Sequence, residues 1–287
     1  MSLNMKLQPW MPEQIAVFDT ETTGVDTEND RIVTAFIGVM NTVTREFVES
    51  WQWLVNPGVE IPKGASDVHG ITNEKARAEG VAPADAIFEI MQRLDILARK
   101  GLVLVAMNAS FDFTILDREI ERHLPGTRPL MEVGDDGRIH RPVVFDPMVM
   151  DRAVDKWRKG TRKLVDLAAV YNVPVEANAH DAGADCLMAG RIAIKLLGHS
   201  RLAQMSLSEV HDKLIPTKFS QAKSLAEFWR DKKLPNLKRE LQQAMDPERQ
   251  EALRIEIAQL EASIQDVLSR GVYWPMVPRP TTKEQSE

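Results

Sequence analysis

The stretch VFDTETTG, residues 17–24, constrains the fold most, because it sets two carboxylates two residues apart directly after an apolar run. Ile15 to Asp19 is predicted to form a short buried strand, in which side chains at positions i and i+2 point to the same face. Two anions on one face repel each other, and a divalent cation between Asp19 and Glu21 would relieve that repulsion. The alternative for this stretch alone is a strand end that runs into a turn, with both acids solvated.

The composition excludes several classes of protein. The 287 residues are 44% hydrophobic and 27% charged, which is ordinary for a water-soluble globular protein of one or two domains. The single cysteine, Cys186, allows neither an intrachain disulfide nor a zinc finger, so we expect a reducing, cytoplasmic location. No segment is typical of a signal peptide or a membrane span, and no membrane role is expected. The net charge of −6 argues against a protein that coats nucleic acid through bulk electrostatic attraction. It does not argue against an enzyme that holds a few nucleotides beside bound metal ions.

Hydrophobic periodicity predicts an α/β domain up to about residue 200. The strands are expected at residues 15–19, 31–40, 45–54, 102–107 and 143–145, the first three as an antiparallel meander. The helices are expected at residues 83–100, 111–123, 147–157, 164–171 and 182–197. The Gly- and Pro-rich stretch 56–72 is predicted to be a loop.

Residues 221–270 are almost entirely helix-forming, with an interruption at Pro235. Asp246 followed by proline predicts a helix start, and Gly271 predicts its end. A heptad seam of about two and a half repeats lies between them, at Leu253, Ile257, Leu260, Ile264 and Val267. The seam is short for a coiled coil, so an antiparallel hairpin within the chain is favoured over a dimer or partner-binding coiled coil.

Three separate segments place acids where α/β folds build their sites, at strand ends and helix starts. Asp112 follows the predicted central strand, and Asp185 follows His180 by five residues at another helix start. Taken alone, Asp112 is most simply a helix cap. Together with Asp19 and Glu21, the acids could converge and bind Mg²⁺ or Mn²⁺, which prefer carboxylate oxygens. Two such ions about 3.5–4 Å apart can clamp both oxygens of a phosphoryl transfer, and a histidine can take a proton from water.

The motifs VFDTETTG, NASFD and HDAGAD, in this order, resemble those of the DEDDh 3'→5' exonucleases, the family similar to the epsilon proofreading subunit of bacterial DNA polymerase III. The stretch IPKGASDVHGIT matches a fourth element of that family. The resemblance covers roughly residues 13–198, and within the motifs HDAGAD departs slightly at Gly183, where a bulkier apolar residue is more frequent. It implies a ribonuclease H-like fold, a mixed five-stranded sheet flanked by helices, in an exonuclease domain 1–200 followed by a helical extension 201–287.

The resemblance also implies a role for each matching residue. Four acids would hold two Mg²⁺ or Mn²⁺ ions, namely Asp19, Glu21, Asp112 and Asp185. His180 would be the general base. Five further residues would contact or shape the site of the terminal nucleotide, namely Thr20, Thr23, His69, Asn108 and Phe111.

The predicted activity is metal-dependent 3'→5' removal of nucleoside monophosphates from single-stranded DNA. Trimming of RNA 3' ends is the alternative, and a non-catalytic binding module is a hypothesis of another class. The catalytic part and the WP-containing C-terminus also look similar to stand-alone exonucleases of actinobacteria and their phages. No polymerase-binding tail is recognisable, and residues 201–287 could instead bind a replication or repair protein.

Residues 151–163, DRAVDKWRKGTRK, form a local basic ridge in this acidic chain. Its cations are Arg152, Lys156, Arg158, Lys159, Arg162 and Lys163. The ridge could be a solvated loop, or it could contact the phosphates of an incoming strand.

Overall fold

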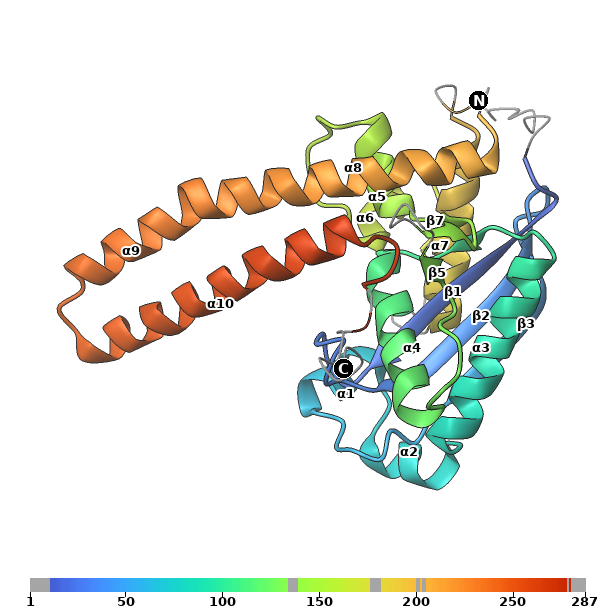
Figure 1. The fold of residues 1–287 in the computed structure, drawn as a ribbon, viewed down its shortest axis with the longest axis horizontal. Helices are drawn as coiled ribbons and strands as arrows, with labels where there is room; N and C mark the ends of the chain where they lie inside the picture. Colours follow the sequence, from blue (N-terminus) through green and yellow to red (C-terminus); the bar gives the residue numbers. More distant parts are fainter. Residues whose placement is uncertain are drawn as a thin grey trace, which may run out of the picture.

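The computed structural model describes residues 11–133, 139–175, 182–199, 202, 205–277 and 279. A five-stranded sheet lies at its centre, in the order β3-β2-β1-β4-β7 (Figure 1). The antiparallel part consists of β1 (Gln14–Thr22), β2 (Ile32–Asn41) and β3 (Phe47–Leu54). On the other side of β1, β4 (Leu104–Val105) and β7 (Val144–Phe145) continue the sheet in parallel. The expected mixed five-stranded sheet is therefore confirmed.

Helices cover both faces of the sheet. α3 (Pro83–Arg99) and α4 (Ala109–His123) pack together on one face, and α7 (Ala182–Leu197) lies on the other, near α5 (Pro147–Val154) and α6 (Leu164–Val170) (Figure 1). Consecutive residues of β1 face these two layers. The ring of Phe18 lies 5.6 Å from that of Phe113 in α4. Val17 lies so close to Gly190 that a Cβ there would come within 2.9 Å of its side chain, so a glycine allows α7 to approach the sheet.

The predicted loop 56–72 is partly helical, which corrects the sequence-based interpretation. α1 (Lys63–His69) lies within it and α2 (Asn73–Glu79) follows directly. Gly70, at φ 73°, ends α1, and the hydroxyl of Thr72 accepts a hydrogen bond from Lys75 N to begin α2. Periodicity missed α1 because none of its side chains is fully buried and seven residues span only two turns.

Other element bounds also differ from the prediction. The central strand β4 has two residues in place of the predicted 102–107, and α5 ends at Val154, before the basic loop. An additional two-stranded ribbon is formed by β5 (Glu132–Val133) and β6 (Ile139–Arg141). These elements are short, and short strands carry little pattern of their own.

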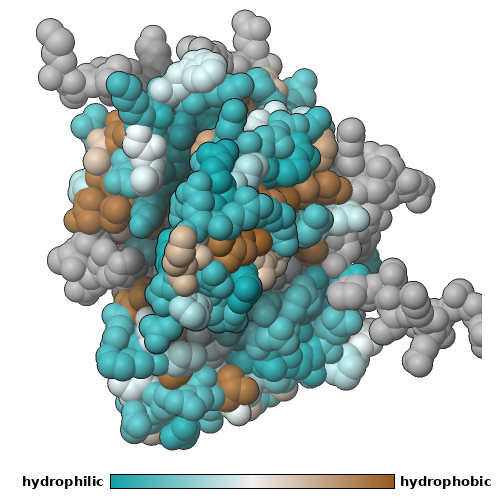
Figure 2. Space-filling view, turned by 90° about the vertical axis from the view of Figure 1, so that its left-hand side faces the viewer, coloured by the Kyte–Doolittle hydropathy of each residue, from teal (hydrophilic) through white to brown (hydrophobic). Residues whose placement is uncertain are grey.

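The extension is a long helical hairpin that projects from the sheet domain (Figure 1). Its outgoing arm comprises α8 (Leu207–Phe228), a π-helical segment (Trp229–Lys233) and α9 (Leu234–Gln243). α10 (Pro247–Val272) returns beside this arm. The seam of α10 is buried against the outgoing arm, in a cluster of Ala226, Leu237, Leu253, Ile257, Leu260 and Ile264. The heptad seam is therefore covered within the chain, and the surface seen from the hairpin tip is mainly hydrophilic (Figure 2).

The cap predicted at Asp246 is present, since its carboxylate accepts from the N–H groups of Glu248 and Arg249. The stop predicted at Gly271 is wrong, because α10 continues to Val272. A Cβ at Gly271 would lie 2.3 Å from the Cβ of Ala222 in α8. This glycine therefore permits a close helix crossing, and it does not end the helix.

The chain after α10 returns to the sheet domain. Trp274 is buried, with its ring 5.4 Å from that of His211, whose side chain hydrogen-bonds the backbone of Val144 in β7. Further on, Val277 N donates to Thr114 Oγ1 in α4 at 3.0 Å. The hairpin is thus anchored on the sheet domain at both of its ends. In the part of the chain that the structure describes, no helix has the length and apolar character to cross a bilayer.

Candidate active site

The predicted acids meet at the carboxyl end of β1. Asp19 lies on the same side of the strand as Val17, the residue that packs on α7, and Asp185 lies in the first turn of α7. Burial raises the pKa of Asp19 well above its ordinary value, and the charges of Asp112, Glu21 and Asp185 raise it further. The carboxylates of three segments distant in the sequence are therefore close enough to repel one another at Asp19.

Asp112 is held against β1 from the opposite layer. Its side chain is 3% exposed, and its Oδ1 accepts hydrogen bonds from Thr20 N at 3.1 Å and Thr20 Oγ1 at 2.8 Å. Burial raises the pKa of Asp112 to about 7, with a contribution from the charge of Asp146, while the bonds from Thr20 lower it. Asp112 is not the cap residue of α4, a position held by Asn108, so the simple capping interpretation is wrong.

Asp146 is a residue at this site that the sequence analysis missed. It is fully buried, and its carboxylate accepts from the N–H groups of Asn108 at 3.3 Å and Ala109 at 3.1 Å. It also caps α5 through the N–H groups of Met148 and Val149. Asp146 thereby ties the end of β7 to the start of α4, the helix of Asp112. The available signal was Asp followed by Pro, the same helix-start pattern that was recognised at residues 246–247.

Two of the predicted nucleotide contacts are engaged within the protein. Thr20 directs its hydroxyl at Asp112, as described above. Thr23 is 5% exposed; its hydroxyl donates to Asp30 Oδ1 at 2.8 Å and accepts from Arg31 N at 3.0 Å. The Thr20 hydroxyl therefore holds α4 to β1 and the Thr23 hydroxyl organises the loop after β1, and the contact of either with a nucleotide stays a prediction.

The other predicted contacts lie around the same strand end. His69, at the end of α1, accepts from Ile71 N at 3.1 Å and lies beside the backbone of Thr22. Burial lowers the pKa of His69 despite these backbone contacts, which favours the neutral ring. Asn108 is exposed, in the left-handed region at φ 61°, and Phe111 packs partly on the core. His180 lies outside the described residues, so the assignment of a general base stays a prediction.

The donor set suits a hard divalent cation, since it consists of carboxylates whose mutual repulsion a cation would relieve. Within the described ranges, however, no three His, Cys, Asp or Glu side chains already stand close enough to share one ion. The residue types are those that such an ion prefers, and its binding here stays a prediction.

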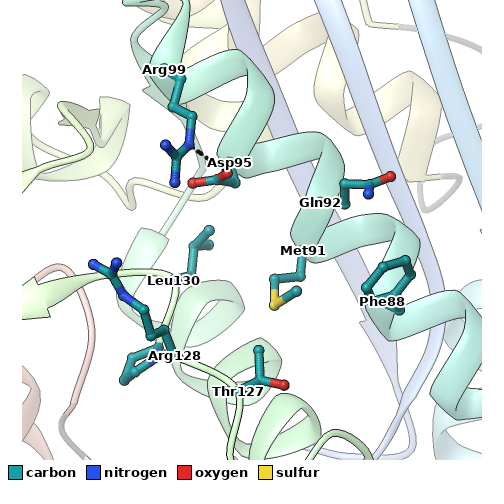
Figure 3. Close-up of a pocket in the computed structure, with 9 residues that line it drawn as sticks. Phe88, Met91, Gln92, Asp95, Arg99, Thr127, Arg128 and Leu130 are labelled. Atoms are coloured by element: carbon teal, nitrogen blue, oxygen red, sulfur yellow. Dashed lines mark hydrogen bonds and ion pairs between the residues drawn. The ribbon is translucent and has the colours of Figure 1, made fainter.

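A cavity of about 310 Å³ between α3 and residues 127–130 is separate from the acids (Figure 3). Phe88, Met91 and Leu130 give it apolar walls. Its carboxylate, Asp95, accepts from Arg99 Nε at 2.7 Å. None of the predicted site residues lines this cavity, so it is not the candidate active site.

Comparisons with known proteins show the family of the chain. The family model RNase_T, described as exonuclease, matches residues 16–193. The DNA polymerase III subunit epsilon-like protein of Rhodobacter capsulatus is 45% identical over 105 residues, 36% of this chain and 14% of that protein. The DNA polymerase III subunit epsilon of Treponema pallidum is 33% identical over 103 residues, 36% of this chain and 44% of that protein. Each match therefore spans less than half of the relative's length.

Solved structures share the fold. The crystal structure of E. coli exonuclease I in complex with a dA16 oligonucleotide superposes with a TM-score of 0.55 at 20% identity, over 75% of this chain and 45% of that one. At this identity the likeness shows the fold alone. The expected ribonuclease H-like architecture is therefore confirmed.

Proposed function

The chain belongs to the RNase_T family of exonucleases, and we propose that it removes nucleoside monophosphates from the 3' ends of single-stranded DNA with the help of divalent metal ions. The observation that carries the proposal is the convergence of Glu21, Asp112 and Asp185 on Asp19 at the end of β1. A group of buried carboxylates destabilises a fold unless it binds something positive, so the arrangement is best explained by a cation-dependent activity.

The four carboxylates would hold two Mg²⁺ or Mn²⁺ ions. When bound, such ions stabilise the charge that develops on a phosphodiester during hydrolysis and favour deprotonation of the attacking water. Asp19 has the central place in this proposal, since its charge meets those of the other three acids. Thr20 orients Asp112 through two hydrogen bonds, and Asp146 orients the start of α4. His180, by the family resemblance, would accept the proton of the attacking water.

Single-stranded DNA is the first choice of substrate because a protein of the same fold binds dA16. RNA is the second choice. A site that admits the 2'-hydroxyl of ribose would accept RNA as well as DNA. The epsilon-like relatives suggest a replication protein as a partner. In this chain, the long hairpin would be the region available for such a contact.

The test is digestion of single-stranded DNA and RNA oligonucleotides of one sequence, each labelled at its 5' end. Reactions contain Mg²⁺, Mn²⁺ or a chelator, and the variant Asp19→Ala is run beside the wild type. A metal-dependent ladder that shortens from the 3' end and disappears in Asp19→Ala is expected, on DNA or on RNA.

The matched control is Asp67→Ala, which removes an exposed carboxylate of α1 that pairs with Lys63 across one helical turn. Its activity should equal that of the wild type. If folded wild-type protein with either metal produced no ladder on either strand type, the enzyme proposal would fail, and the non-catalytic binding module would replace it.

A further inference from the structure

The basic loop after α5 is fixed in place by a buried acid. Asp151 is fully buried, and its Oδ2 accepts from Arg158 Nη2 at 2.9 Å and from Arg162 Nε at 2.7 Å. Tyr171 donates its hydroxyl to the other oxygen at 2.8 Å. Two of the six ridge cations, Arg158 and Arg162, therefore stabilise the loop from within the protein. The loop they hold, residues 155–163, forms a defined wall of the domain.

This wall faces α8 across a groove. Two adjoining cavities, of about 360 and 330 Å³, lie between α5 with its loop and α8, and both are lined by Arg152 and Gln221. The floor of the first cavity is apolar, with Met148 from α5 and Leu225 from α8. The hairpin therefore builds one side of the groove and the sheet domain builds the other.

The groove is lined by cations from both sides. These cations are Arg152, Lys156, Arg162, Lys213 and Lys218. No carboxylate side chain is among the described residues that line the two cavities, although the whole chain has a net charge of −6. A local excess of positive charge in an acidic protein indicates a surface for an anionic ligand.

Three of these cations form no ion pair with a carboxylate of the described residues. Among the described residues, no carboxylate forms an ion pair with Arg152, Lys156 or Lys213, whereas Arg162 binds Asp151. The Lys156 ammonium lies 5.2 Å from the ring centroid of Trp157, which is 84% exposed. Unpaired cations beside an exposed aromatic ring and an apolar floor suit the phosphates and bases of a single nucleic-acid strand.

The groove borders the helix that Asp146 caps. Gln221, which lines both cavities, donates its Nε2 to the backbone oxygen of Val149 in α5 at 3.0 Å. Asp146 caps the start of α5 through the N–H groups of Met148 and Val149. Asp146 in turn holds the N–H groups of Asn108 and Ala109, at the start of the helix that carries Asp112. We propose that this groove binds the backbone phosphates of single-stranded DNA upstream of the 3' end that is cleaved. This inference rests on the proposed function and gives the helical extension a role in holding substrate.

The test is a triple variant, Arg152→Ala/Lys156→Ala/Lys213→Ala, assayed for binding a fluorescent 20-nucleotide single strand in chelator at several salt concentrations. A Kd at least tenfold above that of the wild type is expected. The slope of log K against log salt should fall by about 2, because each lost phosphate contact on a single strand removes about 0.7. Trp157→Ala should weaken binding without changing this slope.

A matched control variant, Lys232→Ala/Lys233→Ala/Arg239→Ala, removes the same charge from exposed positions beyond Leu225, the last groove residue on α8. It should bind as the wild type does. Circular dichroism and thermal melting check that both triple variants are folded. The same binding measurements are repeated with single-stranded RNA. If the groove variant loses affinity for both DNA and RNA, the groove binds phosphates of either strand type; if it loses affinity for DNA alone, the groove is specific for DNA.

Hydrolysis of the p-nitrophenyl ester of dTMP separates this proposal from the proposed function, since this substrate has no upstream phosphates. The groove variant should hydrolyse the ester within twofold of the wild-type rate, with a raised KM on the 20-mer and a similar kcat. Unchanged DNA binding in an active groove variant would overturn the groove and leave the exonuclease intact. If the groove variant bound DNA more weakly than the wild type, and the wild type hydrolysed neither the ester nor the 20-mer, the groove would be supported and the exonuclease activity rejected.

Discussion

Oδ1 of Asp112 accepts two hydrogen bonds from Thr20, from its backbone N at 3.1 Å and its hydroxyl at 2.8 Å, although 92 residues separate the two. Thr20 lies between Asp19 and Glu21 on β1. The acid from α4 is therefore held to the strand that carries the other two acids, in a buried environment that favours a fixed geometry.

Thr20→Val should lower kcat by about 10- to 100-fold, the usual effect of losing a hydrogen bond that orients a metal-binding carboxylate. Thr20→Ser keeps the hydroxyl and should retain most of the activity. Steady-state kinetics over a series of Mg²⁺ concentrations measures the effect, and higher Mg²⁺ should partly rescue the valine variant. Equal activity of the valine and serine variants would contradict this role of the hydroxyl.

The raised pKa of Asp112 predicts that the metal-free protein loses stability as the pH rises. The pKa is about 7 in the folded protein and ordinarily 3.8, so the folded state binds more protons between these values. The free energy of unfolding therefore decreases from about pH 4 to pH 7 and then levels off. Asp19, whose pKa is also raised, acts in the same direction.

Thermal melting in chelator at pH 5 and pH 8 measures this dependence. Wild-type protein should melt at a lower temperature at pH 8, and Asp112→Asn should reduce the difference because asparagine cannot ionise. Added Mg²⁺ should raise the melting temperature at pH 8 more in the wild type than in the variant. If the wild-type protein in chelator were equally stable at both pH values, protonation of Asp112 would not contribute to its stability.

Asp151→Ala should destabilise the protein by about 3–5 kcal/mol, the usual cost of removing one partner of a buried ion pair, because the carboxylate binds two arginines and a tyrosine. Burial and the bond to Asp151 raise the pKa of Tyr171, so the variant should titrate this phenol at a lower pH. Urea unfolding and ultraviolet titration give the two readouts.

Asp155→Ala is the matched control, because the side chain of Asp155 is exposed and Arg162 uses only its backbone oxygen. Its stability should lie within about 0.5 kcal/mol of the wild-type value. A similar loss in both variants would show that the loop does not depend on the buried acid.

Gly271→Ala should destabilise the hairpin by about 1–3 kcal/mol, since the new Cβ would lie 2.3 Å from that of Ala222 and force α8 and α10 apart. Gly64→Ala is the control: nothing lies within 4 Å of its added Cβ, and alanine in α1 should slightly stabilise the protein. Chemical denaturation compares the two. If Gly271→Ala were as stable as the wild type, the close crossing would not constrain the helices.

The sequence alone determined the fold class and the order of the main elements. The apolar run of residues 15–18 predicted the core of β1, and α7 occupies the predicted residues 182–197. These signals are local, because burial on one face imposes a repeat of 2 or 3.6 residues on neighbouring positions. The acids of the site were visible for a similar reason, since like charges at strand ends and helix starts stand out from an apolar pattern.

The partners that those residues meet depend on the three-dimensional fold. Asp146 and Asp151 read as ordinary acids in the sequence, yet each is buried and organises groups up to 38 residues away. Gly271 reads as a helix stop, yet it makes room for a neighbouring helix. The basic ridge was visible in the sequence, but the groove that it forms with α8 was not. These features depend on distances between segments remote in the sequence, and a local pattern of residues does not encode such distances.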